Sequence, residues 1–268
     1  MLKNIIKSLM PVKYHSLIRR KLAQYSRISE PKSKVYAGND MSILQCCIAY
    51  NKYGGFCLPL SSIYRPASQK ILRGEVWEPD TIKFMMEHAG KGDIIHAGTY
   101  FGDFIPALSR SLNSDAKLWA FEPNPENYRC ASITVAINNL RNVVIHNAGL
   151  GESAGQLQMM IVDEKGQSLG GASRFSDGQN IGERKYISVD VKTIDDVIPE
   201  NRTISIIQLD VEGFERQALS GSLNTIKREK PILILENLPD EQWLSENILN
   251  MGYRVIDKLH DNTYLVYK

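Results

Sequence analysis

The sequence has no excess of either charge, few cysteines and no long apolar run, and each absence argues against a class of function. Lys plus Arg number 32 and Asp plus Glu number 30, a formal net charge of +2. The chain therefore lacks the strong positive charge that favours binding to nucleic-acid phosphates. No apolar stretch approaches the roughly 20 residues of a membrane-spanning helix. We expect a folded protein with no nucleic-acid partner and no transmembrane segment, because 268 residues, 43% of them hydrophobic, can bury a full core.

The four cysteines match neither a disulfide framework nor a zinc site. Cys46 and Cys47 are adjacent, and Cys57 and Cys130 follow without a Cys-x-x-Cys spacing. We interpret all four as reduced, buried, small apolar side chains, and we expect a cytoplasmic protein.

Residues 1–27 mix basic and apolar side chains, and Pro11 interrupts any helix near their middle. The segment lacks the apolar core and cleavage site of a secretory signal. We interpret it as a helix packed on the body or on a partner subunit. A homo-oligomer and peripheral membrane contact through this basic helix stay open.

From residue 77 onward, helix-length segments alternate with short apolar runs. The strands expected are Asp93–Ala97, Lys117–Phe121, Val143–His146, Ile204–Leu209, Ile232–Leu235, Tyr253–Asp257 and Asn262–Tyr267. Strand–helix alternation predicts a parallel sheet, and the last two runs should pair antiparallel. We therefore predict a doubly wound, seven-stranded, Rossmann-like α/β domain over residues 77–268, with a C-terminal antiparallel hairpin. Residues 1–76 are assigned to an N-terminal helical or irregular cap.

A glycine-bearing turn after the first strand is the first signal of a cofactor site. Gly98 and Gly102 follow Asp93–Ala97, and glycines at a strand end let the backbone approach a ligand closely. Their spacing differs from the Gly-x-Gly-x-x-Gly of pyrophosphate binding, which weighs against a nicotinamide-dependent oxidoreductase. A turn that merely packs the helix on the strand is the alternative.

An acidic residue follows the next strand, about 20 residues beyond the glycine turn. Glu122 lies in Phe121-Glu122-Pro123-Asn124-Pro125, at the distance where doubly wound proteins place the acid that binds ribose hydroxyls. We predict that Glu122 accepts hydrogen bonds from both hydroxyls. The alternative is an ordinary acid at a helix N-terminus.

With these signals the chain resembles the FkbM-type methyltransferases over roughly Trp77 to Glu236. The resemblance rests on Trp77-Glu78-Pro79, the glycine turn, Phe121-Glu122-Pro123-Asn124-Pro125, Asn147-Ala148-Gly149-Leu150-Gly151, Thr193-Ile194-Asp195-Asp196, Leu209-Asp210-Val211-Glu212-Gly213-Phe214-Glu215, Pro231 and Glu236. It implies a class I methyltransferase fold with S-adenosylmethionine (SAM) as donor and S-adenosylhomocysteine (SAH) as product. It also implies O-methylation of a hydroxyl on a sugar, a glycan or a secondary metabolite.

The resemblance further indicates which residues hold the cofactor. Gly98 and Gly102 match the family's Asp-x-Gly-x-Asn-x-Gly turn, but His96 stands where Asp is typical and Tyr100 where Asn is typical. We predict that His96 lines the methionyl end of SAM; the alternative is a hydrogen-bonded residue at a strand end. The predicted cofactor-binding set is Glu78, His96, Gly98, Thr99, Tyr100, Gly102, Glu122, Pro123, Asn124, Asn147, Ala148 and Asp210.

Three carboxylates are the candidate catalytic residues. Asp210 and Glu212 follow an apolar strand and Glu236 ends the next, at the sheet edge where α/β proteins bind ligands. Methyl transfer to a hydroxyl needs a base and close alignment, and a carboxylate beside the sulfonium of SAM should stay ionised. In the alternative, the acids cap a helix and orient the site. An oxygen site for a hard cation is also conceivable, but we assign no metal.

The strand–helix alternation breaks between residues 152 and 191, where we predict an insertion with strands Gln156–Val162 and Lys185–Val191. Its Gly- and Ser-rich loop is of the kind that often contacts substrate. Ser168, Ser173 and Arg174 are predicted to bind hydroxyls or an acidic group of a small-molecule or glycan acceptor; a solvated hairpin loop is the alternative.

The departures at His96 and Tyr100 leave open a binding protein of the same fold that has lost catalysis. An oxidoreductase is the weakest of the three functions. An oxygen acceptor is favoured over nitrogen because the chain has no Asn-Pro-Pro-Tyr-type sequence.

Overall fold

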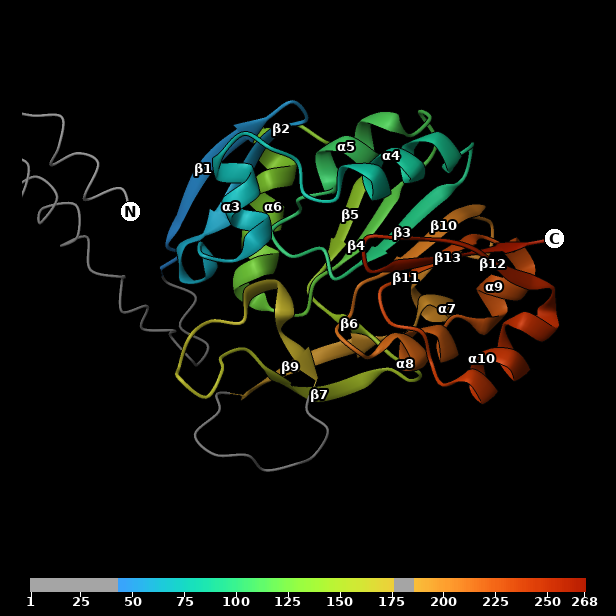
Figure 1. The fold of residues 1–268 in the computed structure, drawn as a ribbon. Helices are drawn as coiled ribbons and strands as arrows, with labels where there is room; N and C mark the ends of the chain where they lie inside the picture. Colours follow the sequence, from blue (N-terminus) through green and yellow to red (C-terminus); the bar gives the residue numbers. More distant parts are fainter. Residues whose placement is uncertain (1–42, 176–185) are drawn as a thin grey trace, which may run out of the picture. The chain divides into compact units, whose positions relative to one another are not determined.

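A mostly parallel seven-stranded sheet forms the centre of the fold (Figure 1). The computed structural model describes residues 43–175 and 186–268, so the predicted N-terminal helix lies outside the described residues. The strands are β3 (Asp93–Ala97), β4 (Leu118–Phe121), β5 (Val143–His146), β10 (Ile204–Leu209), β11 (Ile232–Leu235), β12 (Tyr253–Leu259) and β13 (Asn262–Tyr267). Their order is β12-β13-β11-β10-β3-β4-β5, and β13 runs in the direction opposite to the other six strands. This confirms the predicted doubly wound sheet with its C-terminal hairpin.

Helices cover both faces of this sheet because its central strands are apolar on both sides. Side chains alternate along β3, so that Ile94 belongs to one core cluster and Ile95 to the other. The first face is covered by α4 (Pro79–His88), α5 (Ile105–Ser111) and part of α6 (Pro125–Ile137). The second face is covered by α7 (Ile194–Val197), α8 (Glu215–Ser220), α9 (Leu223–Glu229) and α10 (Glu241–Asn247). No described helix is both long and apolar enough to cross a membrane.

The insertion forms a second, four-stranded sheet. Its strands are β6 (Gly149–Leu150), β7 (Gly155–Met160), β8 (Arg174–Phe175) and β9 (Tyr186–Lys192), in the order β6-β9-β7-β8. β7 and β9 correspond to the two predicted strands, whereas the two-residue strands β6 and β8 were not predicted. The parallel pairing of β6 with β9 places this sheet beside the end of β5.

The described part of the predicted N-terminal cap contains a hairpin that the sequence pattern did not reveal. β1 (Cys46–Asn51) pairs antiparallel with β2 (Gly54–Pro59), and α3 (Pro66–Leu72) follows. Five consecutive residues of β2 are buried, so the strand lacks the polar–apolar alternation that identifies a half-exposed strand. The described residues, 43–175 and 186–268, belong to one compact unit, and the boundary at residue 76 stays a prediction.

Four hydrogen bonds from three residues converge on the carboxylate of Asp93 and tie the start of β3 to its neighbours. Asp93 is 1% exposed and accepts hydrogen bonds from Arg202 Nε (2.8 Å), Trp119 Nε1 (2.7 Å) and the backbone N–H of Lys117 (2.8 Å). Arg202 Nη2 adds a further contact to the carboxylate at 2.5 Å.

We predict that Asp93→Ala lowers the free energy of unfolding by about 3–5 kcal/mol, because it leaves a partly buried guanidinium without its partner. Denaturant unfolding would measure this loss. The matched control is Asp115→Ala, since Asp115 contacts Arg202 only through its backbone carbonyl. Equal stability of the Asp93 and Asp115 variants would contradict the prediction.

Candidate functional site

The ends of β3 and β10 meet where the strand order of the large sheet reverses, the place where such sheets bind ligands. Gly98 has a φ of +80°, and a Cβ there would lie 1.7 Å from the carbonyl oxygen of Asp210. The backbone N–H of Asp210 donates to the carbonyl of Ala97 at 3.1 Å. Only glycine fits at position 98, because any side chain would clash with the carbonyl of Asp210. The contact holds Asp210 at the carboxyl end of β10.

A tight turn after β10 brings Asp210 and Glu212 together. β10 ends at Leu209, and Glu212 and Gly213 have left-handed φ values of 54° and 91°. Glu215 Oε1 accepts the backbone N–H of Val211 at 3.2 Å and closes the turn. The two acids therefore come together through this turn and not through the alternation of side chains along a strand. A non-glycine residue in this conformation is typical of functional sites.

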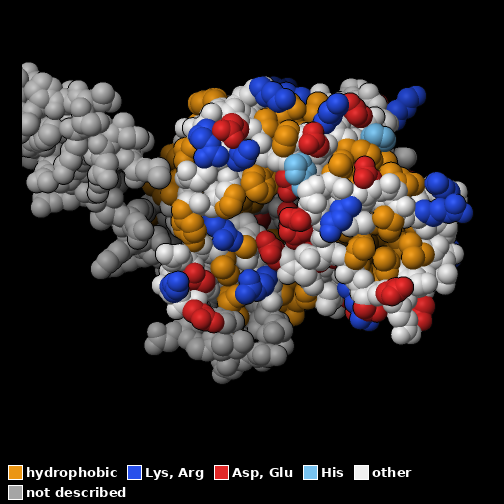
Figure 2. All heavy atoms as spheres, viewed as in Figure 1, with side chains coloured by type: hydrophobic (Ala, Val, Ile, Leu, Met, Phe, Trp, Pro, Cys, Tyr) orange, Lys and Arg blue, Asp and Glu red, His pale blue; other side chains and the backbone are white. Residues whose placement is uncertain are grey.

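Carboxyl groups converge at the ends of β10 and β11. One oxygen from each of Asp210, Glu212 and Glu236 lies within 4.8 Å of the others, and acidic side chains gather at a hollow near the middle of the face in Figure 2. Glu78, whose Oε2 accepts a 2.7 Å hydrogen bond from Asn262, faces the same group. The oxygen spacing would suit a base or a hard cation.

Burial raises the pKa values of Asp210, Glu212 and nearby Asp103, and none of these three carboxyl groups forms a salt bridge with a described residue. Burial and then the charge of Glu236 raise the pKa of Glu212 to about 7, although Arg65 and Arg174 oppose the shift. Burial and Glu236 also raise the pKa of Asp210. Burial and then Glu78 raise the pKa of Asp103 to about 7. The expectation of an ionised carboxylate assumed a neighbouring cation; without one, burial and mutual repulsion favour the protonated form.

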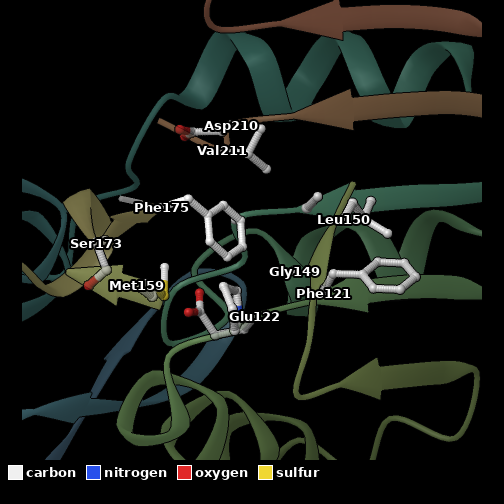
Figure 3. Close-up of a pocket in the computed structure, with 13 residues that line it drawn as sticks. Phe121, Glu122, Gly149, Leu150, Met159, Ser173, Phe175, Asp210 and Val211 are labelled. Carbon is white, nitrogen blue, oxygen red and sulfur yellow. The ribbon is translucent and has the colours of Figure 1, made fainter. Parts of the chain in front are cut away.

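A small cavity lies beside these carboxyl groups (Figure 3). It has room for about 20 Å³, close to the space that one water molecule needs. The lining residues are Ala97, Gly98, Phe121, Glu122, Pro123, Gly149, Leu150, Met159, Gly171, Ser173, Phe175, Asp210 and Val211. The structure thus gathers Gly98, Glu122, Pro123, Ser173 and Asp210 of the predicted residues around one cavity.

Glu122 connects the glycine turn to the start of α6. Its Oε2 accepts the backbone N–H of Tyr100 and its Oε1 that of Asn124, both at 2.8 Å. The side chain is 3% exposed, and burial raises its pKa to about 8. Oε1 also accepts a 3.4 Å hydrogen bond from Asn127 Nδ2, so Oε2 is the oxygen that keeps a lone pair with which to accept a hydrogen bond from a ligand hydroxyl.

Several predicted cofactor residues support the cavity rather than line it. Asn124 caps α6 by accepting the N–H of Glu126 at 3.0 Å, and Asn147 donates to the carbonyl of Glu122 at 2.9 Å. Ala148 is fully buried, and Gly102 turns the chain with a φ of +85°. The buried hydroxyl of Thr99 has no partner among the described residues.

The structure turns His96 and Tyr100 away from the cavity. His96 points to the α5 side of β3, where its ring stacks on Phe104 at 5.2 Å and its Nδ1 pairs with Gln208. Burial lowers the pKa of His96 to about 4, so the ring is neutral at pH 7. The hydroxyl of Tyr100 pairs with Ser62 at 2.6 Å, next to α3. The prediction that His96 lines the cofactor site therefore has no support from its position, because strand alternation sends its side chain to the opposite face.

Two of the predicted acceptor residues form hydrogen bonds within the structure. Ser168 Oγ accepts the N–H of Gly170 at 3.3 Å. Ser173 Oγ donates to the carbonyl of Gly170 at 2.7 Å and accepts from Asn124 Nδ2 at 3.1 Å. Arg174 is exposed, close enough for its charge to act on Glu212.

The main residues that sequence reasoning missed are the apolar ones in the cavity wall. Met159 and Phe175 come from the insertion, and Val211 lies between the two predicted acids. Phe175 follows directly after Arg174, so the same loop prediction could have included it. Periodicity gave no signal, because β8 has only two residues.

Comparison with known proteins finds a family model that matches more than half of the chain. The model of the methyltransferase FkbM domain matches residues 96–266. Methyltransferase 1 of Beauveria bassiana is 24% identical over 175 residues, which cover 58% of this chain and 62% of that protein. The structure of the FkbM methyltransferase from Methylobacillus flagellatus is 20% identical to this chain. The match covers 66% of this chain and 44% of the Methylobacillus chain, with a TM-score of 0.47. The structure of a SAM-dependent methyltransferase from Aquifex aeolicus is 15% identical to this chain. The match covers 76% of this chain and 92% of that one, with a TM-score of 0.40. The chain thus spans less than two thirds of the first two relatives.

The raised pKa of Glu122 predicts a pH-dependent effect of Glu122→Gln on stability. Between about pH 4.5 and pH 8 the folded wild type retains a proton that the unfolded chain has lost, so rising pH destabilises the wild type through this group. The glutamine variant has no such proton. We expect the free energy of unfolding of the variant, relative to that of the wild type, to increase as pH rises from about 4.5 to 8. Urea unfolding at several pH values, with exposed Glu87→Gln as control, would measure it; a difference that does not change with pH would refute the raised pKa.

Proposed function

This chain belongs to the FkbM methyltransferase family, and from that premise we propose that it methylates a hydroxyl oxygen of a sugar, a glycan or a secondary metabolite. The methyl donor of this family is SAM, and the product is SAH. The observation that carries the proposal is the cluster of Asp210, Glu212 and Glu236 at the carboxyl ends of β10 and β11, beside a cavity that contains Glu122.

The chemistry of the described residues fits SAM. SAM carries a sulfonium and an ammonium, and the site offers buried carboxyl groups without a described salt-bridge partner. Glu122 would hold the ribose, because its Oε2 can still accept a hydrogen bond from a hydroxyl. The buried, unpartnered hydroxyl of Thr99, next to Gly98, supplies a further polar group on the same turn. We keep Glu78, Gly98, Thr99, Glu122, Pro123 and Asp210 as the proposed cofactor residues, with Gly102, Asn124, Asn147 and Ala148 as their support.

The three carboxyl groups suit the removal of a proton from an acceptor hydroxyl. When bound, SAM supplies an electrophilic methyl group on sulfur. A pKa near 7 lets Glu212 exchange a proton at neutral pH. Glu212 would accept the proton of the acceptor hydroxyl as its oxygen receives the methyl group, with SAH as the product. Asp210 and Glu236 would share the remaining negative charge of the carboxyl cluster and orient the acceptor hydroxyl.

An acceptor would approach between the carboxyl cluster and the insertion. Arg174 is exposed on that side and could bind an acidic group of the acceptor. Ser168 and Ser173 are less suited to direct contact, because both are buried and hydrogen-bonded within the structure. The alternative function, binding of SAM without catalysis, predicts SAH binding but no methylated product.

The proposal as a whole can be tested by incubation of the protein and SAM with extracts of glycans and small metabolites. We expect an acceptor that gains the mass of one methyl group, detected by mass spectrometry. Identification of that acceptor supplies the substrate for turnover measurements on the variants below.

We predict that Glu122→Ala weakens SAM binding by at least about 1.5 kcal/mol, the contribution of hydrogen bonds to a charged group. Calorimetric titration would measure the loss. Glu122→Gln, which keeps one acceptor oxygen, should lose less. Unchanged SAM affinity in a folded Glu122→Ala variant would remove Glu122 from the cofactor site.

We predict that Glu212→Gln lowers turnover by about 10²–10⁴, the usual contribution of a general base, while SAM affinity changes much less. Asp210→Asn tests the neighbouring carboxyl group in the same way, and exposed Glu241→Gln is the control. Near-normal turnover in both site variants would contradict this assignment. The base would then be Glu236, or the reaction would depend only on holding donor and acceptor close together. Loss of turnover in EDTA that Mg²⁺ restores would instead favour a cation held by the three carboxylates.

A further inference from the structure

The ring of Phe175 fills the space between the two halves of the proposed cofactor site. Figure 3 shows it pointing into the gap between Asp210 and Val211 on one side and Glu122 on the other. The ring lies against Gly149, where a Cβ would come within 2.4 Å of its Cζ atom. Gly149 therefore accommodates Phe175 in this position, and a larger residue would expel the ring.

A nucleoside cofactor cannot enter while the ring is there. The cavity has room for about 20 Å³, whereas pockets for small-molecule ligands are typically about 300–1,000 Å³. The residues that remain around the cavity nevertheless suit a flat apolar group, because Phe121, Leu150 and Met159 supply its apolar walls. Glu122 stands next to this space, where the ribose attached to such a group would lie. Phe175 thus occupies the place of a nucleobase.

The Phe175 ring belongs to a short strand that is last in the described order of the four-stranded sheet. β8 consists of two residues, and among the described residues it pairs with Met159 and Met160 of β7. The ring of Phe214, at the start of α8, packs against Phe175 with a centroid distance of 4.5 Å and an angle of 50°. Phe175 is only half-buried, so its departure exposes less apolar surface than that of a core residue would.

We propose that Phe175 is a gate that fills the nucleobase position of the cofactor site in the ligand-free protein and must leave before the cofactor binds. This inference rests on the proposed function. A protein that must first adopt a less populated open state binds its ligand more weakly, by the fraction of molecules that are open. Phe175 therefore lowers the affinity and the association rate of the cofactor. Arg174 precedes it in β8, so movement of the gate also displaces a proposed acceptor contact.

The gate can be tested with SAH, which binds without turnover. Calorimetry and stopped-flow tryptophan fluorescence would compare the wild type with Phe175→Ala and Phe175→Leu, the second of which keeps most of the apolar bulk. We expect the SAH dissociation constant of Phe175→Ala to fall by about tenfold, as removal of a closed state populated at about 90% requires. The observed binding rate of the wild type should level off at high SAH concentration, and that of the alanine variant should rise linearly.

Phe214→Ala separates a gate from a binding residue, because it removes the packing partner of Phe175 and leaves Phe175 itself. As a gate variant it should bind SAH faster than the wild type, and Tyr50→Ala, on exposed β1, should not. Weaker SAH binding by Phe175→Ala would overturn the gate and make Phe175 a ring that stacks on the adenine. Unchanged binding would overturn it as well. If neither the wild type nor any variant binds SAH or SAM, the proposed function itself fails.

Discussion

At the point where the strand order of the large sheet reverses, Gly98 touches the backbone of Asp210, and no residue with a side chain could take its place. This contact joins the loop after β3 to the turn after β10. The hydrogen bonds of Glu122 then connect the glycine turn to α6. The positions of Gly98, Glu122 and Asp210 depend on these contacts, which hold the loops of the site on a rigid sheet.

The carboxyl groups near this junction are costly for the ligand-free protein. Burial disfavours the ionised forms of Glu122, Asp103, Asp210 and Glu212. Backbone N–H groups donate to Glu122 and Asp103, and none of the four forms a described salt bridge. A cationic ligand would relieve this cost, because its charge favours the ionised carboxylates. Stability and ligand affinity are thus coupled through the same groups, as is typical where function requires groups that do not stabilise the fold.

The apolar side of the cavity is filled by a side chain of the protein itself. In the absence of a ligand, the ring of Phe175 lines the same cavity as Phe121 and Leu150. The ring is flat and apolar, as a nucleobase is. The protein thereby avoids an empty apolar cavity, whose walls would lose their packing contacts. The proposed gate is a consequence of this packing, because a site shaped for a planar ring is also filled well by a side chain that carries one.

The sequence alone determined the doubly wound sheet, the terminal hairpin and the family, because strand–helix alternation and motifs such as Asp210-Val211-Glu212-Gly213 are local in the chain. It also placed Glu122 and Asp210 at the carboxyl ends of two strands of the sheet. The hairpin of β1 and β2 escaped it because β2 is buried without alternation. Only the tertiary structure decided that His96 faces α5, that Ser168 and Ser173 bond within the fold, and that Phe175 enters the cavity. Those outcomes depend on which segments pack against each other across long sequence separations, and neither periodicity nor a motif records such contacts.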